Sequence, residues 1–125
     1  NILLDLFTED PVWFPWSSEQ VAKVAERGTL GINAVIYAEI SLRFERIEDL
    51  EDALPREILR LSLPWEAAFL AGKVFLDYRR AGGRKTSPLP DFFIGAHALV
   101  EGMALLTRDP SPYRTYYPSL PLLCP

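Results

Sequence analysis

Apolar and polar positions along this chain change period repeatedly, and this pattern predicts an α/β protein. Segments with helical periodicity are interrupted by short apolar runs of the kind that form buried strands. Helices are expected at 1–7, 17–27, 33–44, 47–54, 65–81 and 92–98, and strands at 30–32, 59–63, 103–106 and 122–123. Because helices alternate with strands, the strands are expected to form a parallel sheet with helices on both faces.

Residues that start and stop helices set several of these bounds. Ser17 is predicted to be the N-cap of the second helix, since Gln20 follows it by three residues, and Gly28 is its expected end. The long helix after Pro64 carries apolar residues at i, i+4, i+7 and i+11, and this spacing predicts a stripe that faces the core. The stripe consists of Trp65, Phe69, Gly72 and Leu76.

Three carboxylates occupy positions at which a parallel α/β sheet gathers its ligands. Asp91 immediately precedes an apolar helix, and Asp109 follows an apolar strand. Ligands of such sheets bind at the carboxyl ends of strands and near helix N-termini. Glu39 is expected among core positions of its helix, where a carboxylate is costly unless it is paired, with Arg43 for example, or coordinated. Together these acids predict a divalent metal site and phosphate chemistry, although an aspartate before a helix is more often a simple cap.

The composition excludes several classes of protein. The chain has 125 residues, of which 49% are hydrophobic and 24% charged, as in an ordinary globular domain. Its single cysteine, Cys124, rules out an internal disulfide and predicts a reducing, cytoplasmic location. A single histidine makes a zinc site improbable, and no apolar run reaches the roughly 20 residues of a membrane span.

A net charge of −4 argues against a general attraction to nucleic acid, but one segment is strongly basic. The segment 79–87 lies just before Asp91 and is either a solvated loop or a surface that positions phosphates. The candidate RNA-binding residues are Arg79, Arg80, Arg84, Lys85 and, next to Asp109, Arg108.

Other polar and aromatic residues have plainer expected roles. Asp5 is expected to be a surface or helix-start acid without a metal role. His97 is expected on a polar helix face, solvated and paired with Glu101 four residues later. Trp13 and Trp16 could stack on RNA bases, but packing in the core or at a partner interface is the favoured interpretation.

Four segments, taken in order, resemble the PIN-domain family, and most closely its VapC-type ribonuclease toxins. They are Asn1-Ile2-Leu3-Leu4-Asp5-Leu6-Phe7, the segment 32–41 around Glu39, the segment 90–98 that begins Pro90-Asp91, and Leu105-Leu106-Thr107-Arg108-Asp109. Each segment alone is weakly informative, whereas all four at family-like spacing are specific. The resemblance extends over essentially the whole chain.

The resemblance implies a single domain over 1–125 with a three-layer α/β/α fold around a central parallel sheet. It implies a metal site of four acids, of which Glu39, Asp91 and Asp109 would be three, with Thr107 supporting the last. Asn1 matches the Asn of the family's first motif, so the first acid and its central strand are expected upstream of Asn1, and the domain is expected to be N-terminally truncated.

The activity that the resemblance implies is that of an endoribonuclease toxin that uses Mg²⁺ or Mn²⁺ and belongs to a type II toxin–antitoxin pair. A homodimer and a cognate antitoxin with a basic tail are implied as well. One alternative is a catalytically inactive PIN module that binds RNA or a partner protein. Another is a flavodoxin-like phosphoacceptor domain, for which the sequence offers no convincing pair of aspartate and lysine.

Overall fold

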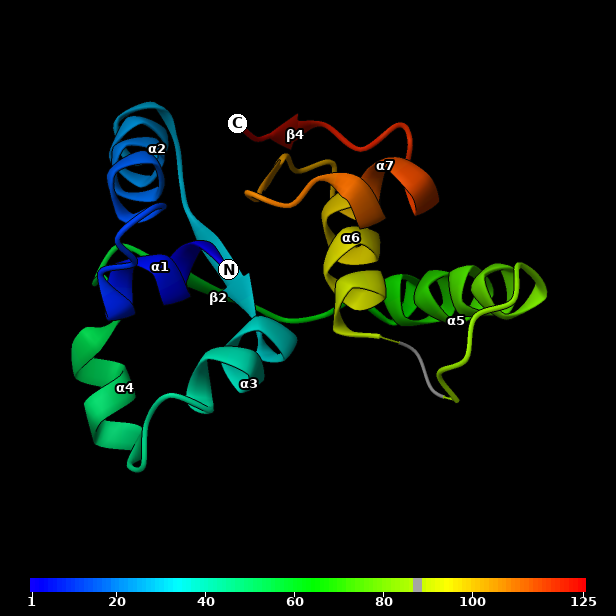
Figure 1. Ribbon diagram of the computed structural model, residues 1–125, viewed down its shortest axis with the longest axis horizontal. Helices are drawn as coiled ribbons and strands as arrows, with labels where there is room; N and C mark the ends of the chain where they lie inside the picture. The colour runs from blue at the N-terminus through cyan, green and yellow to red at the C-terminus, as the bar shows by residue number, and fades with distance from the viewer. Residues whose placement is uncertain (87–88) are drawn as a thin grey trace. The chain divides into compact units, whose positions relative to one another are not determined.

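The computed structural model describes residues 1–86 and 89–125, and the chain divides into two compact units, Asn1–Ser62 and Leu63–Pro125. Each unit combines helices with a pair of parallel strands (Figure 1). The expected α/β class with parallel pairing is therefore confirmed. Within the described residues the strands form two sheets of two strands each.

The N-terminal unit surrounds the parallel pair of β1 and β2 with four helices. Strand β1 (Gly31–Asn33) pairs with β2 (Leu59–Leu61), and Ile32 lies opposite Arg60. The connection between these strands contains α3 and α4, as a parallel crossover requires. The helices of this unit are α1 (Ile2–Thr8), α2 (Phe14–Arg27), α3 (Ala34–Ser41) and α4 (Ile47–Ala53).

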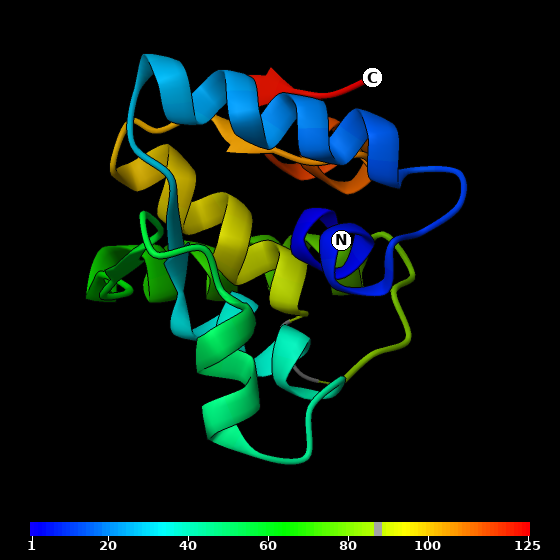
Figure 2. The same ribbon diagram turned by 90° about the vertical axis from the view of Figure 1, so that its left-hand side faces the viewer.

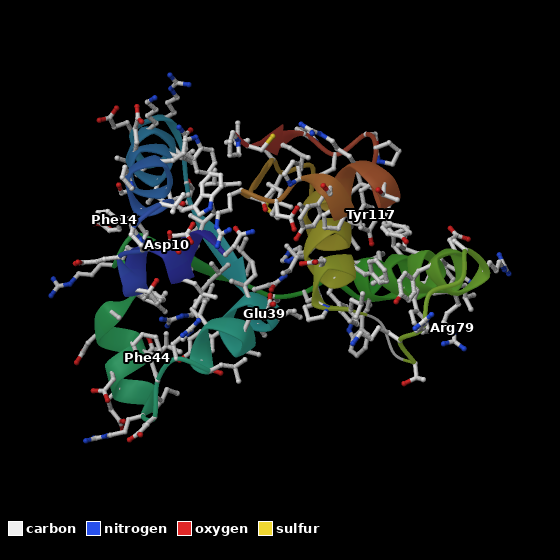
Figure 3. The ribbon with its side chains drawn as sticks, in the orientation of Figure 1. Asp10, Phe14, Glu39, Phe44, Arg79 and Tyr117 are labelled. Carbon is white, nitrogen blue, oxygen red and sulfur yellow. The ribbon has the colours of Figure 1, made fainter. Side chains whose placement is uncertain are left out.

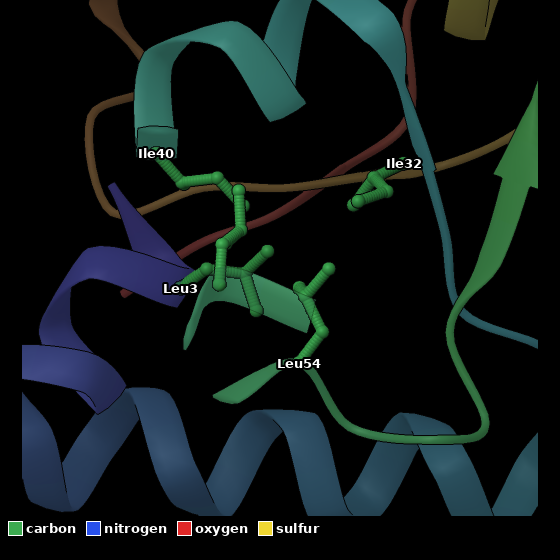
Figure 4. Packing of buried hydrophobic residues seen from close by; sticks show 5 residues of the cluster. Leu3, Ile32, Ile40 and Leu54 are labelled. Atoms are coloured by element: carbon green, nitrogen blue, oxygen red, sulfur yellow. The ribbon is translucent and has the colours of Figure 1, made fainter. Parts of the chain in front are cut away.

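The core of the N-terminal unit is a small aliphatic cluster contributed by four elements and one cap position (Figure 4). Leu50 and Ile40 are each only 2% exposed, and the partly buried Phe7 and Phe44 rings meet edge to face against this cluster. The buried members are Leu3, Ile32, Ile40, Leu50 and Leu54. Burial of this apolar surface fixes α1, α3 and α4 around β1.

Helix α2 begins earlier than predicted, because Ser17 is not its N-cap. The Asp10 side chain accepts hydrogen bonds from the backbone N–H groups of Val12 and Trp13, at 2.9 Å each, and so stabilises the turn that leads into Phe14. Ser17 lies fully buried inside the helix. The predicted end is confirmed, since the Gly28 N–H donates to the Val24 carbonyl.

The C-terminal unit pairs β3 (Leu105–Leu106) with β4 (Leu122–Leu123) in parallel, as Figure 2 shows in orange and red. Its helices are α5 (Trp65–Arg80), α6 (Pro90–Val100) and α7 (Ser111–Tyr116). The nearly all-apolar α6 is the most buried helix of the unit. Residue 87, the last of the predicted basic segment 79–87, and residue 88 lie outside the described residues.

The predicted core stripe of α5 is wrong. Trp65 is 89% exposed and Phe69 is 68% exposed, whereas the buried residues of α5 are Ala67, Ala71 and Val74 on the opposite face. Small side chains let two helix backbones approach closely, so alanine rather than tryptophan occupies the packed face of α5.

Candidate active site

Asp91 lies in the first turn of α6 and is held there by a tyrosine from α7. Pro90 is the first residue of the helix and Leu89 is its N-cap, so Asp91 is a helical residue rather than a cap. The hydroxyl of Tyr113 donates to Asp91 Oδ1 at 3.1 Å. The N-terminus of a helix carries partial positive charge, which attracts acidic side chains.

A close approach between α6 and the end of α7 seats Tyr113. A side chain in place of Gly95 would bring Cβ within 2.5 Å of the Tyr117 ring and 3.2 Å of the Tyr113 ring. The Tyr117 hydroxyl donates to the Phe92 carbonyl at 2.7 Å, and burial raises the pKa of Tyr117. Gly95 therefore permits the contact that places both tyrosines against α6.

Asp109 lies at the start of the segment that carries Tyr113. It follows β3 by three residues, it is exposed, and its N–H donates to the Thr107 hydroxyl at 3.1 Å. Thr107 is only 3% exposed. A buried threonine thus shapes the turn at Asp109. The short segment 109–113 joins Asp109 to Tyr113, whose hydroxyl bonds to Asp91.

Glu39 belongs to the other unit and is exposed near the end of α3 (Figure 3). Its expected place among core residues is wrong. The buried face of α3 is formed by Ile40 with the partly buried Ile36 and Tyr37. Leu42, the residue at which α3 is capped, is 85% exposed.

The candidate ligands are oxygen donors of the kind that Mg²⁺ and Mn²⁺ prefer. Asp91 is half-buried, and its printed hydrogen bond engages Oδ1 rather than Oδ2. Among residues 1–86 and 89–125, no three acidic, histidine or cysteine side chains gather into a group that could hold a metal ion. The donor chemistry fits a hard cation, and the structure places Asp91 and Asp109 in one unit and Glu39 in the other.

Part of the basic segment is used within the fold. Arg79 Nη1 donates to the Lys85 carbonyl at 2.8 Å, and Arg80 pairs with Asp77 at 3.6 Å (Figure 3 labels Arg79). Arg84 and Lys85 are exposed and Arg108 is half-buried. The loop is therefore folded back on the end of α5, and it presents Arg84 and the Lys85 side chain to solvent.

Two buried polar residues differ from expectation. Asp5, expected at the surface, is only 2% exposed in α1 and accepts a hydrogen bond from the Ser17 hydroxyl at 2.7 Å. His97, expected on a polar face, is only 4% exposed in α6. Desolvation lowers the pKa of His97, and the nearby Glu101 carboxylate opposes that shift. Both residues are therefore buried in the fold rather than solvated.

Asn1 and the tryptophans complete the predicted set. Asn1 is the exposed N-cap residue of α1, and its carbonyl accepts from the Asp5 N–H at 2.9 Å. Trp13 and Trp16 are half-buried and meet edge to face, with ring centroids 6.1 Å apart. Sequence reasoning did not single out Tyr113, whose only signal is its position four residues after Asp109; it is the third residue of α7.

The chain belongs to the PIN domain family, whose model matches residues 1–116. The fold is similar to that of VapBC2 from Rickettsia felis, solved bound to a DNA fragment from their promoter, with a TM-score of 0.75 and 18% identity. That match covers 99% of this chain and 93% of the other. VapBC-1 from nontypeable Haemophilus influenzae matches with a TM-score of 0.72 and 18% identity, over 99% and 92% of the two chains.

These comparisons confirm the family resemblance drawn from the sequence. A search of curated proteins finds no match. Among the described residues, no helix is long and apolar enough to cross a membrane.

Proposed function

We propose that this chain is a metal-dependent endoribonuclease, the toxin of a type II toxin–antitoxin pair. Its membership of the PIN domain family and its fold similarity to VapBC structures support this proposal. The observation that carries it is the placement of Asp91 in the first turn of α6. The hydroxyl of Tyr113, which lies four residues after Asp109, donates a hydrogen bond to the Asp91 carboxylate. This arrangement holds the Asp91 carboxylate between two helices of one unit.

Glu39, Asp91 and Asp109 are the residues that would hold Mg²⁺ or Mn²⁺. A divalent ion bound by carboxylates lowers the pKa of a water molecule and stabilises charge on the phosphate during phosphodiester hydrolysis. Tyr113 keeps Asp91 Oδ1 in a single orientation by donating a hydrogen bond to it. Thr107 shapes the turn at Asp109, and Asn1 would support the first part of the site.

The substrate would be held through its backbone by the exposed cations of the loop after α5. Arg84 and Lys85 are exposed, and Arg108 adjoins Asp109. Arg79 and Arg80 contribute charge to the same segment while their side chains bond to Lys85 and Asp77. Such contacts position a phosphodiester without reading its sequence.

The partners would be a second copy of the chain and an antitoxin that carries a basic segment. The net charge of −4 and the acidic site suit a cationic partner. The chain would act in the cytoplasm, where its RNA substrate and antitoxin are available.

The test is cleavage of a set of RNA classes by the purified protein with Mn²⁺, with EDTA, and as the variants Asp91→Asn and Asp109→Asn. Asp52→Asn is the matched control, because Asp52 is an exposed aspartate of α4. Cleavage that needs the metal, is lost in both site variants and persists in the control would support the proposal. No cleavage by the folded protein would instead favour a PIN module that acts by binding.

A further inference from the structure

The segment that follows α5 is fixed to the last turn of that helix. We use the name α5 loop for residues 81–86, which Figure 1 shows turning back along α5. The Gly83 N–H donates to the Tyr78 carbonyl at 2.9 Å, and the Gly82 N–H donates to the Arg79 carbonyl at 3.0 Å. Gly82 has a φ of 93°, as is usual for the glycine that ends a helix and satisfies its last carbonyls. The direction in which the α5 loop leaves the helix is therefore fixed.

The side chain of Tyr78 holds the far part of the α5 loop. Its hydroxyl accepts a hydrogen bond from the Lys85 N–H at 3.3 Å, and Arg79 Nη1 donates to the Lys85 carbonyl at 2.8 Å. A Cβ atom at Gly83 would lie 2.2 Å from the Tyr78 ring, so glycine lets the loop pass close to that ring. Both backbone polar groups of Lys85 are thus bonded to α5, while its side chain is exposed.

The ring of Tyr78 also contacts the helices that carry the candidate active site. It meets the Phe92 ring edge to face with the centroids 5.6 Å apart, and Phe92 follows Asp91 in α6. Tyr116 of α7 completes a cluster of three rings, with its centroid 5.1 Å from that of Phe92 and 6.4 Å from that of Tyr78. Edge-to-face contacts of this kind favour a defined ring geometry. One side chain therefore bonds to the α5 loop and packs beside the aspartate helix.

We propose that Tyr78 is a positioning residue that holds Lys85 for binding a phosphate of the RNA backbone beside the first turn of α6. The inference rests on the proposed function and names the contact through which its substrate is held. Lysine binds phosphate as a point charge, so the position of its backbone decides where the phosphate lies. A cation on a loop that is already ordered loses less conformational freedom on binding than one on a free loop. Tyr78 therefore contributes to affinity through Lys85.

The test measures binding separately from cleavage. The probe is a fluorescein-labelled oligouridylate in EDTA, and fluorescence anisotropy gives its dissociation constant over about 50–200 mM salt. Each phosphate contact to a single strand contributes about 0.7 to the slope of log K against log salt concentration. Lys85→Gln should weaken binding about three- to tenfold and reduce the slope by about 0.7. Lys23→Gln removes the same charge from the exposed pair with Glu19 and should leave the slope unchanged.

Tyr78→Phe keeps the ring and removes only the hydroxyl that accepts from Lys85. It should weaken binding about two- to tenfold, and the double variant with Lys85→Gln should bind within about twofold of Lys85→Gln alone. In RNA cleavage, Tyr78→Phe should raise KM by the same factor and leave kcat unchanged. Tyr116→Phe is the matched control, since it removes a hydroxyl from the same ring cluster without altering the Lys85 bond.

Circular dichroism and urea unfolding would confirm that each variant folds. A folded parent that does not bind the probe, or independent losses from Tyr78→Phe and Lys85→Gln that multiply in the double variant, would overturn the proposal. An equal loss of affinity in Tyr116→Phe would overturn it as well. Coupled losses of binding in a protein that cleaves no RNA with Mn²⁺ would support the positioning role of Tyr78 and overturn the proposed nuclease activity instead.

Discussion

The hydroxyl of Tyr113 donates a hydrogen bond to Asp91 Oδ1 at 3.1 Å, although the two residues lie 22 positions apart in the chain. Tyr113 is only 6% exposed in α7, and Asp91 is half-buried in the first turn of α6. The bond links the segment that begins at Asp109 to the helix that carries the other aspartate. A single buried tyrosine therefore orients the carboxylate on which the proposed chemistry depends.

Replacing Tyr113 by Phe should lower RNA cleavage about tenfold and weaken activation by Mn²⁺, because Asp91 loses its donor and with it a fixed orientation. Stability should fall by about 0.5–1.5 kcal/mol. The measurement is the cleavage rate over a Mn²⁺ titration. Tyr117→Phe is the matched control, since it removes a buried hydroxyl that bonds to the Phe92 carbonyl instead. Equal loss of metal activation in both variants would show that Tyr113 acts only through stability.

Replacing Gly95 by Ala should destabilise the protein by about 1–3 kcal/mol, because the new Cβ would meet the Tyr117 ring at 2.5 Å. Gly72→Ala adds the same methyl group at an open helical position and should be neutral or stabilising by up to about 1 kcal/mol. Urea unfolding in dilute solution would compare them. Similar behaviour of both variants would mean that the approach of α6 to the tyrosines is looser than the structure shows.

Replacing Ser17 by Ala should cost about 1–3 kcal/mol, because the buried Asp5 carboxylate loses the hydroxyl that donates to Oδ2 at 2.7 Å. Ser18 provides the control, since its hydroxyl donates to the Pro15 carbonyl at an exposed position and Ser18→Ala should change stability by less than about 0.5 kcal/mol. Thermal unfolding would measure both. If Ser17→Ala melts with the parent, the Asp5 carboxylate does not depend on this bond.

Stability should fall as the pH decreases below about 6.5, the ordinary pKa of histidine. The pKa of His97 is lowered in the folded protein by desolvation, so the unfolded chain binds the proton more readily. The contribution of the neutral form is complete above the unfolded pKa and is lost as the pH falls toward the folded pKa. His97→Gln should flatten this dependence between about pH 7.5 and about pH 5.5. An unchanged slope would assign the dependence to other groups.

Much of the local architecture could be predicted from sequence. Gly28 ends α2 as expected, α4 lies within the predicted 47–54, and the parallel pairing of β1 with β2 follows from the alternation of helices and strands. Four short segments were also sufficient to identify the PIN domain family, which the family match confirms. The metal roles of Glu39, Asp91 and Asp109, and the acid and strand expected before Asn1, stay predictions.

The errors share a cause, which is that periodicity identifies apolar faces but not the face that another element covers. Helix α5 has two such faces, and the larger side chains of Trp65 and Phe69 suggested the wrong one. Close packing selected the alanine face instead. In the same way, Ser17 was predicted to cap α2, but its hydroxyl is buried and donates to Asp5. The side chain that bonds to the turn before α2 is that of Asp10.

The sequence by itself determined the α/β class, the family, most helix and strand positions and the oxygen-donor chemistry of the candidate site, because these follow from local periodicity and from residue types near one another in the chain. Only the tertiary structure decided which face of α5 is buried, why Asp5 and His97 lie inside, and that Tyr113 orients Asp91. These features depend on contacts between residues far apart in the chain, and side-chain size and hydrogen-bonding partners become decisive only where such elements meet.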